Sequence, residues 1–307
     1  MGMEALRRRI AGIVGRVEGI MGVAVRDVET GEEIGIRADE PFPMASVCKT
    51  PILVEAYRRA ESGTLSLDKR VEISRATRTF GSGLFNFFDE GLTPTVRDLI
   101  LMMIVVSDNA ATDLVLKELG GPAAVTEAMR QLGLPAIHLD RTIRQLLADI
   151  YAAIDSRTCD LDYFALEALR TEDSELAAKL RDPEAARAGI RAATQGRDTA
   201  TPRDIARLYA QIARNECASP DSCAAILQTL ERQQLKGRLP RELPPYTRFA
   251  HKTGSLGPGT VCNDSGLLFV GDHPIAIAVF SREVVQPPAA TNTAIARIGR
   301  AVYEHFA

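Results

Sequence analysis

Three short polar motifs occur along this chain in an order that could support serine acyl transfer. They are Ser46-Val47-Cys48-Lys49, Ser107-Asp108-Asn109 and Lys252-Thr253-Gly254. On a helix, a spacing of three residues places the Lys49 amine beside the Ser46 hydroxyl. A buried, neutral lysine can accept the hydroxyl proton, so Ser46 is the candidate nucleophile and Lys49 its base.

Ser46 is expected at the N-terminal end of a buried helix. Pro43 precedes the serine, and apolar residues are frequent from Ile52 to Tyr57, a pattern typical of a helix that starts nearby. The free N–H groups at a helix start favour negative charge. The N–H of Ser46 is therefore a candidate for half of an oxyanion hole.

The other two motifs are expected on a buried helix and on a strand. The apolar run from Leu99 to Val106 predicts a helix that carries Ser107-Asp108-Asn109 into a cavity, where buried polar groups need partners or a task. Phe249 to Gly254 predicts a strand on which Lys252 and Thr253 offer a cation and a hydroxyl to a substrate carboxylate. Gly254 would let a ligand approach the backbone closely.

These motifs resemble those of the penicillin-recognising serine hydrolases, and most closely those of the class A β-lactamases. The resemblance covers most of the chain. Its further matches are Gly81-Ser82-Gly83, Thr95 through Asn109, Leu139-Asp140-Arg141 and Arg197 through Pro202.

The resemblance implies a role for each matching residue. Ser46 would be the nucleophile, Lys49 its base, and Ser107 a proton shuttle to the leaving nitrogen. The binding residues that it implies are Asn109 for a substrate amide, Lys252 and Thr253 for the carboxylate, and Ser255, whose N–H would complete the oxyanion hole.

One segment departs from the pattern of the β-lactamases. There, a segment that begins Leu-Asp-Arg continues into a Glu and, four residues later, an Asn, which together hold the water that hydrolyses the acyl-enzyme. Here Ile143 and Leu147 occupy those positions. Because an apolar side chain neither deprotonates nor orients water, we expect acylation to be retained and deacylation to be slow, to use another base or to serve another acceptor.

An insertion of roughly 40 residues relative to the family pattern spans about residues 148–196. Its Ala, Leu, Glu and Arg content predicts helices, with Pro183 at a helix start. The insertion could cover the cleft or reshape substrate choice. It also offers carboxylates as replacements for the missing Glu, although charged residues of an inserted helix usually face solvent: Asp155, Asp160, Glu167 and Glu172.

Two arginines lie upstream of the third motif. Arg238 or Arg241 could reinforce Lys252 in carboxylate binding, because a guanidinium pairs well with a carboxylate in a bidentate manner. The alternative for both is an exposed or salt-bridged loop.

The pattern of elements predicts an α+β fold of the β-lactamase and transpeptidase type. A hairpin at residues 22–36 and three later strands at 249–254, 265–270 and 275–280 frame a helical middle. We expect an antiparallel sheet built from both ends of the chain, residues 1–45 and 225–307, with a helical lobe at 46–224. The active site would lie between the two parts.

Composition narrows the function classes. The chain has 307 residues, 46% of them hydrophobic, and a net charge of −3. No basic patch predicts nucleic-acid binding, and no apolar run is long enough to span a membrane. Four scattered histidines predict no metal site and no cofactor, and five cysteines are expected as reduced thiols. The expected partner is a small substrate that carries a carboxylate.

The N-terminal segment has arginines and no continuous apolar stretch, which predicts a cytoplasmic protein. A periplasmic or secreted protein is the alternative if a leader has been removed. Three functions stay open: a hydrolase of amides, esters or β-lactams that works through an acyl-enzyme on Ser46, a penicillin-binding or sensing protein that stays acylated, and an inactive homologue.

Overall fold

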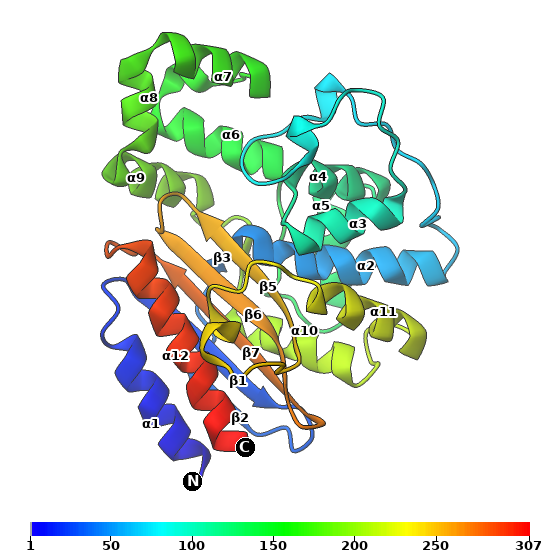
Figure 1. The fold of residues 1–307 in the computed structure, drawn as a ribbon, viewed down its shortest axis with the longest axis vertical. Coiled ribbons are helices and arrows are strands. Elements are labelled where there is room, and N and C mark those ends of the chain that lie inside the picture. The colour runs from blue at the N-terminus through cyan, green and yellow to red at the C-terminus, as the bar shows by residue number, and fades with distance from the viewer. Residues whose placement is uncertain (1) are drawn as a thin grey trace.

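The sheet is assembled from both ends of the chain (Figure 1). In the computed structural model, which describes residues 2–307, five antiparallel strands follow the order β2-β1-β7-β6-β5. They are β1 (Ile20–Asp27), β2 (Glu33–Ile36), β5 (Phe249–Leu256), β6 (Val261–Val270) and β7 (His273–Arg282). A short ribbon pairs β3 (Phe42–Pro43) with β4 (Thr199–Ala200). The predicted α+β class is confirmed.

Helices cover both faces of the sheet. On one face, α1 (Met3–Val14) and α12 (Pro288–Phe306) pack side by side and bury an apolar layer with β1, β6 and β7. On the other face, α10 (Pro202–Ala213) packs on the same three strands. Burial of these apolar faces is the main source of stability in such a layered fold.

A group of helices stands beside the edge strand β5. It contains α2 (Lys49–Glu61), α3 (Val96–Val105), α4 (Asn109–Glu118), α5 (Pro122–Gln131) and α11 (Pro220–Glu231). Local sequence explains their ends. The Thr95 hydroxyl accepts a hydrogen bond from the Asp98 N–H at the start of α3. Gly120 and Gly121 separate α4 from α5, which starts at Pro122.

The inserted segment is helical, as predicted. It forms the last part of α6 (Ile143–Ile154), then α7 (Tyr163–Glu172), α8 (Ser174–Arg181) and α9 (Pro183–Thr194). Asp182 caps α9 by accepting a hydrogen bond from the Ala185 N–H, and Pro183 opens the helix. An apolar cluster that includes Ile150 and Ile190 joins α6 to α9.

The division of the chain at residues 46 and 224 stays a prediction. Helix α10, which falls inside the expected helical lobe, lies on the sheet and buries Tyr209 completely. All five cysteines are free thiols. Among the residues described, no helix has both the length and the apolar character needed to cross a membrane.

Candidate active site

A cavity of about 300 Å³ lies between β5 and α6, and residues from all three motifs line it. The side chains that contact it from the motifs are Ser46, Ser107, Asn109, Thr253 and Ser255. Lys49 and Lys252 lie just behind this surface and are fully buried. Seven of the eight site residues predicted from the sequence are therefore brought together around one cavity.

Ser46 lies in a 3₁₀ turn, Ala45–Cys48, that leads directly into α2. The α-helix begins at Lys49, three residues later than expected, and Ala45, directly before Ser46, has a positive φ of 49°. The Oγ of Ser46 makes no hydrogen bond to any described residue and faces the cavity. A hydroxyl in this state is open to a base and to a substrate.

The Lys49 amine is held by three acceptors from the second motif. Its Nζ donates to the carbonyl of Ser107 at 2.8 Å, to the Oγ of Ser107 at 3.1 Å and to the Oδ1 of Asn109 at 2.7 Å. Burial lowers the pKa of Lys49 to about 8. A minor fraction of this lysine is therefore neutral near neutral pH, and the neutral form can act as a general base.

Lys252 also contacts Ser107. Its Nζ donates to the Oγ of Ser107 at 3.1 Å and to the carbonyl of Thr253 at 2.8 Å. Burial, followed by the charge of Lys49, lowers the pKa of Lys252 well below its ordinary value. The Ser107 hydroxyl consequently bridges two amines and can relay a proton.

The second motif is fixed by its own backbone. Ser107 adopts a left-handed φ of 60°, which is rare for a residue with a side chain and is found at functional sites. Asp108 caps α4 by accepting from the Ala111 N–H, and it also accepts from the N–H groups of Leu84 and Phe85. Asp108 thus shapes its loop, as expected, and aims Ser107 and Asn109 at the cavity.

Gly254 brings the third motif against the nucleophile turn. A Cβ built on Gly254 would lie 2.8 Å from the carbonyl oxygen of Met44 and 3.1 Å from the nitrogen of Ser46. Gly254 also lines the cavity, so close approach of a ligand to its backbone stays a prediction, and its bare Cα additionally admits the backbone of residues 44–47. This close approach sets β5 at Gly254 directly against the backbone of the nucleophile turn.

Arg238 lies outside the cavity lining. Its Nη1 donates to the carbonyls of Gly254 and Asn263, both at 2.6 Å, and its Nη2 donates to the Oγ of Ser255 at 2.6 Å. The side chain is buried. In this structure the guanidinium therefore braces β5 and Ser255, whereas Arg241 is exposed and contacts Thr293.

An apolar wall faces the nucleophile across the cavity. It is formed by Ile143, Leu146, Leu147 and Tyr151, which lie on one side of α6 at helical spacing. Tyr151 packs edge-on against Phe80, and burial raises the pKa of its phenol. The sequence signal for Leu146 and Tyr151 was present, because they follow Ile143 at intervals of three and eight residues.

Asp113 holds the start of this wall and was not singled out from the sequence. Its two carboxylate oxygens accept hydrogen bonds from the N–H groups of Ile143 at 2.7 Å and Arg144 at 2.9 Å. A carboxylate at a helix start is favoured by the helix dipole. Burial raises the pKa of Asp113 to about 6. Its position one helical turn after Asn109 on α4 is the signal that would have marked it.

The carboxylates of the insertion lie away from the cavity. Asp155 pairs with Arg157 at 2.9 Å and with Lys179 at 3.0 Å, and Glu167 pairs with Arg170 at 2.7 Å. Within residues 2–307, no Asp or Glu lines the cavity. The four carboxylates that the sequence offered as replacement bases are thus not placed to act on a water there.

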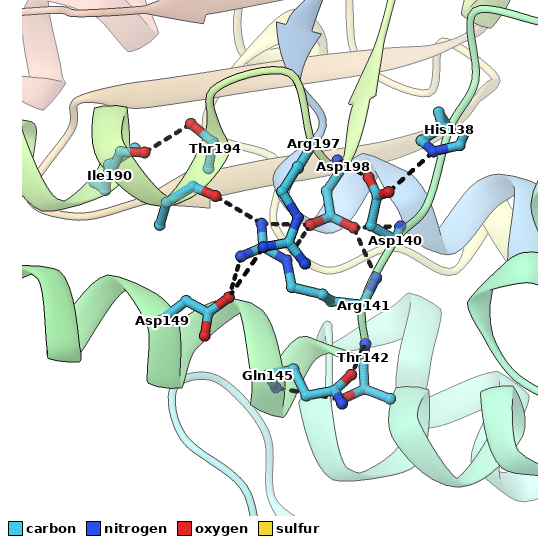
Figure 2. Close-up of polar contacts among 11 residues, drawn as sticks. His138, Asp140, Arg141, Thr142, Gln145, Asp149, Ile190, Thr194, Arg197 and Asp198 are labelled. Atoms are coloured by element: carbon cyan, nitrogen blue, oxygen red, sulfur yellow. Dashed lines mark hydrogen bonds and ion pairs between the residues drawn. The ribbon is translucent and has the colours of Figure 1, made fainter. Parts of the chain in front are cut away.

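An ion-pair network joins the two ends of the inserted segment (Figure 2). Asp198 Oδ2 accepts from the Arg141 Nε at 2.7 Å, and Asp198 Oδ1 accepts from the N–H of Asp140 at 2.8 Å. Arg141 also contacts Asp149 on α6 and donates to the carbonyl of Ala193 on α9 at 2.8 Å. The network ties the chain before the insertion to the chain after it, so the apolar wall has a fixed base.

Comparison with known proteins places the chain in a family. A model of the β-lactamase enzyme family matches residues 5–306. The β-lactamase of Streptomyces albus G is 28% identical over 306 residues, which cover 97% of this chain and 83% of that protein. β-Lactamase CARB-4 of Pseudomonas aeruginosa is 25% identical over 287 residues, which cover 93% and 85%.

Solved structures give the same result. The β-lactamase of Sphaerobacter thermophilus DSM 20745 has a TM-score of 0.77 at 26% identity, over 99% of this chain and 98% of that one. An ancestral class A β-lactamase has a TM-score of 0.78 at 28% identity, over 98% and 100%. PBP-A shares the fold, with a TM-score of 0.77 at 22% identity. With its motif residues gathered around one cavity, this chain belongs to the β-lactamase enzyme family and is a β-lactamase-like serine hydrolase.

Proposed function

We propose that a small substrate carrying a carboxylate acylates this protein at Ser46, and that the resulting acyl-enzyme is hydrolysed slowly. The observation that carries the proposal is the contrast between the two sides of the cavity. One side holds Ser46 beside a complete set of polar groups. The other side, where a hydrolytic water needs a base, consists of Ile143, Leu147 and their apolar neighbours.

In the acylation half, each lysine has a proposed task. Neutral Lys49 takes the proton of Ser46 as its Oγ attacks the substrate carbonyl, and the N–H groups of Ser46 and Ser255 bind the oxyanion. Ser107, 3.1 Å from both amines, then delivers a proton to the leaving nitrogen. Lys252 and Thr253 bind the substrate carboxylate. Every group that acylation requires is supplied by the chain.

For the deacylation half, the described part of the chain gives the cavity no comparable set of polar groups to activate and orient a water. Positioned general bases contribute about 10²- to 10⁴-fold to a rate, and neither Ile143 nor Leu147 can activate or orient a water. Tyr151 is the titratable side chain on this wall, and its raised pKa keeps the phenol protonated. The acyl-enzyme should therefore accumulate.

The apolar wall also favours a second function, that of a penicillin-binding or sensing protein that stays acylated. The wall belongs to α6, which continues into the insertion, so an acyl group bound against Leu146 and Tyr151 would contact the inserted helices directly. A peptidase or esterase that acts on a substrate other than a β-lactam uses the same acylation machinery and is the remaining variant of the proposal.

Time-resolved intact-mass spectrometry after mixing with nitrocefin or benzylpenicillin tests these functions. A persistent adduct that depends on Ser46 supports slow hydrolysis, and an adduct that never clears supports sensing. Rapid substrate loss without an adduct would contradict both.

The matched control is Ser46→Ala, which removes the nucleophile and leaves the lysines and the apolar wall in place. An adduct of equal yield in this variant would overturn the assignment of Ser46. Absence of any adduct in the wild type with both β-lactams and with activated esters would favour the inactive homologue.

A further inference from the structure

A second cavity, of about 330 Å³, lies on α9 and shares no lining residue with the active site. Its walls are α9, the β3–β4 ribbon and the adjoining ends of β6 and β7. Ile190 lines this cavity and belongs to the same apolar cluster as Leu146 and Leu256, which line the active site. Helix α9 of the insertion thus stands between two cavities of similar size.

Two cations on α9 face this cavity without strong partners. Arg187 and Arg191 lie one helical turn apart, and both line the cavity. Arg187 has one long ion pair, at 3.8 Å, with the largely exposed Glu184, which is worth little in free energy. Arg191 has no ion pair with any residue in 2–307. Their guanidinium donors are therefore available to a ligand.

The remaining charges in the cavity are paired or lie at its exposed edge. Arg282 donates to the carbonyl of Pro41 at 2.6 Å and to Glu40 at 2.9 Å, so its charge is already compensated. Glu283 is exposed and lines the cavity as well. Its negative charge disfavours a dianion and leaves a monoanion as the better match for Arg187 and Arg191.

The rest of the lining is largely apolar. Pro41, Pro43, Ile190 and Val261 supply hydrocarbon surface, and Thr199 and Thr260 add two hydroxyl groups. A cavity of at least about 300 Å³ with an apolar lining and a few convergent polar groups is typical of small-molecule sites. Guanidinium groups bind carboxylates through paired hydrogen bonds.

We propose that this cavity is a second binding site, and that it takes a small monocarboxylate with an apolar body. The carboxylate lies on Arg187 and Arg191, and the apolar body packs on Pro43, Ile190 and Val261. This site is distinct from the acyl-enzyme site, because the two cavities share no lining residue.

Titration of ¹⁵N-labelled protein with phenylacetate, followed by amide chemical shifts, tests the proposal. Phenylacetate should shift amides at residues 187–199 and 260–261 and leave those of Ser46, Ser107 and Thr253 in place. Phenylacetamide, which has the same shape and no charge, should bind at least about tenfold more weakly.

The Arg187→Gln, Arg191→Gln double variant should lose the preference for phenylacetate over phenylacetamide. Arg181→Gln is the matched control, because Arg181 is an exposed arginine of the neighbouring helix α8. Equal binding of the two probes by the wild type, undiminished phenylacetate binding by the double variant, or shifts confined to the active site would each overturn the proposal.

Discussion

The amines of Lys49 and Lys252 converge on one oxygen, because each Nζ lies 3.1 Å from the Oγ of Ser107. Both lysines are fully buried, and two adjacent buried cations repel each other. Burial lowers the pKa of both amines, and the charge of Lys49 lowers that of Lys252 further. The proposed transfer of a proton through Ser107 requires contacts of this kind with both amines.

Acylation should depend on pH through Lys49, whose pKa is about 8. Below this pKa the lysine is protonated and cannot accept the proton of Ser46. The acylation rate constant should therefore rise by about tenfold per pH unit from about pH 6 and level off above about pH 8. Stopped-flow measurement with nitrocefin in excess gives the profile.

Lys49→Arg is the control for this profile, because arginine keeps the charge and does not deprotonate in proteins. This variant should be acylated very slowly at every pH. A wild-type rate that does not change over the same pH range would show that Lys49 is not the base.

Restoring polar groups on the apolar wall should accelerate deacylation. In the Ile143→Glu, Leu147→Asn double variant, a carboxylate and an amide would face the cavity from the first turns of α6. The lifetime of the benzylpenicillin adduct should fall by about 10²-fold, the lower range for a positioned base. Intact-mass spectrometry after removal of free penicillin measures the lifetime.

Leu146→Glu is the positional control, since it adds a carboxylate to the same cavity on the same helix. It should leave the lifetime within a few-fold of the wild type. If the control and the double variant shorten the adduct lifetime equally, the effect comes from easier entry of water into the cavity and not from a base at residue 143.

Arg238 should act through Ser255 and β5 and not through the substrate carboxylate. Arg238→Ala removes hydrogen bonds to Gly254, Asn263 and Ser255, and unpaired buried groups cost about 1–3 kcal/mol each. Two activated esters are compared, one with a carboxylate and one with a methyl group in its place. Acylation by both should slow by the same factor. The melting temperature should also fall.

Arg241→Ala, at an exposed position, should leave both rates and the melting temperature unchanged. A loss in Arg238→Ala that is confined to the carboxylate-bearing ester would instead restore the role that the sequence suggested, direct binding of the substrate carboxylate.

Much of the fold could be predicted because its signals are local. Alternation of apolar residues marks strands β1, β6 and β7, and the stop and start residues Gly120 to Pro122 separate two helices. The order β2-β1-β7-β6-β5 could not be predicted, because it depends on which strand edges meet in three dimensions. Sequence patterns therefore show where a strand lies along the chain better than they show which strand it pairs with.

The site divides in the same way. Ser46, Lys49, Ser107 and Lys252 occur in motifs whose spacing carries the chemistry, so the sequence identifies them. The partners of Arg238 and the acceptor role of Asp113 depend on contacts between segments far apart in the chain. No local pattern encodes such contacts, and for this reason the bracing of β5 and of α6 emerged only from the structure.

Loss of the ion-pair network that joins the two ends of the insertion should make the apolar wall more mobile. In Arg141→Ala, Asp198 loses its buried ion pair and both Asp149 and the carbonyl of Ala193 lose a donor. Loss of one partner of a buried pair typically costs about 3–5 kcal/mol. Hydrogen exchange should speed up across residues 142–197 and remain slow in β6 and β7.

Arg197→Ala is the matched control, because Arg197 reaches Asp149 only at 3.6 Å and is half exposed. It should leave exchange in the insertion nearly unchanged. If hydrogen exchange in Arg141→Ala became faster over the whole chain, the ion-pair network would stabilise the protein as a whole and not the insertion in particular.

Gly254→Ala should disable the oxyanion hole while leaving the nucleophile in place. The added methyl would lie 2.8 Å from the Met44 oxygen and 3.0 Å from the Val47 nitrogen. Because these are backbone atoms, β5 and the nucleophile turn must move apart, and the N–H groups of Ser46 and Ser255 would separate. Loss of one oxyanion donor lowers a rate by about 10²- to 10³-fold, so the acylation rate constant should fall by about that factor.

Gly237→Ala provides the comparison, because a Cβ there would meet no atom within 4 Å. That variant should be acylated at the wild-type rate. The two rate constants are measured under single-turnover conditions with nitrocefin, and Ser46 labelling by mass spectrometry confirms the site. Since the methyl of Gly254→Ala points at residues 44–47 and not into open cavity, an unchanged acylation rate would mean that the two N–H groups do not act together on the oxyanion.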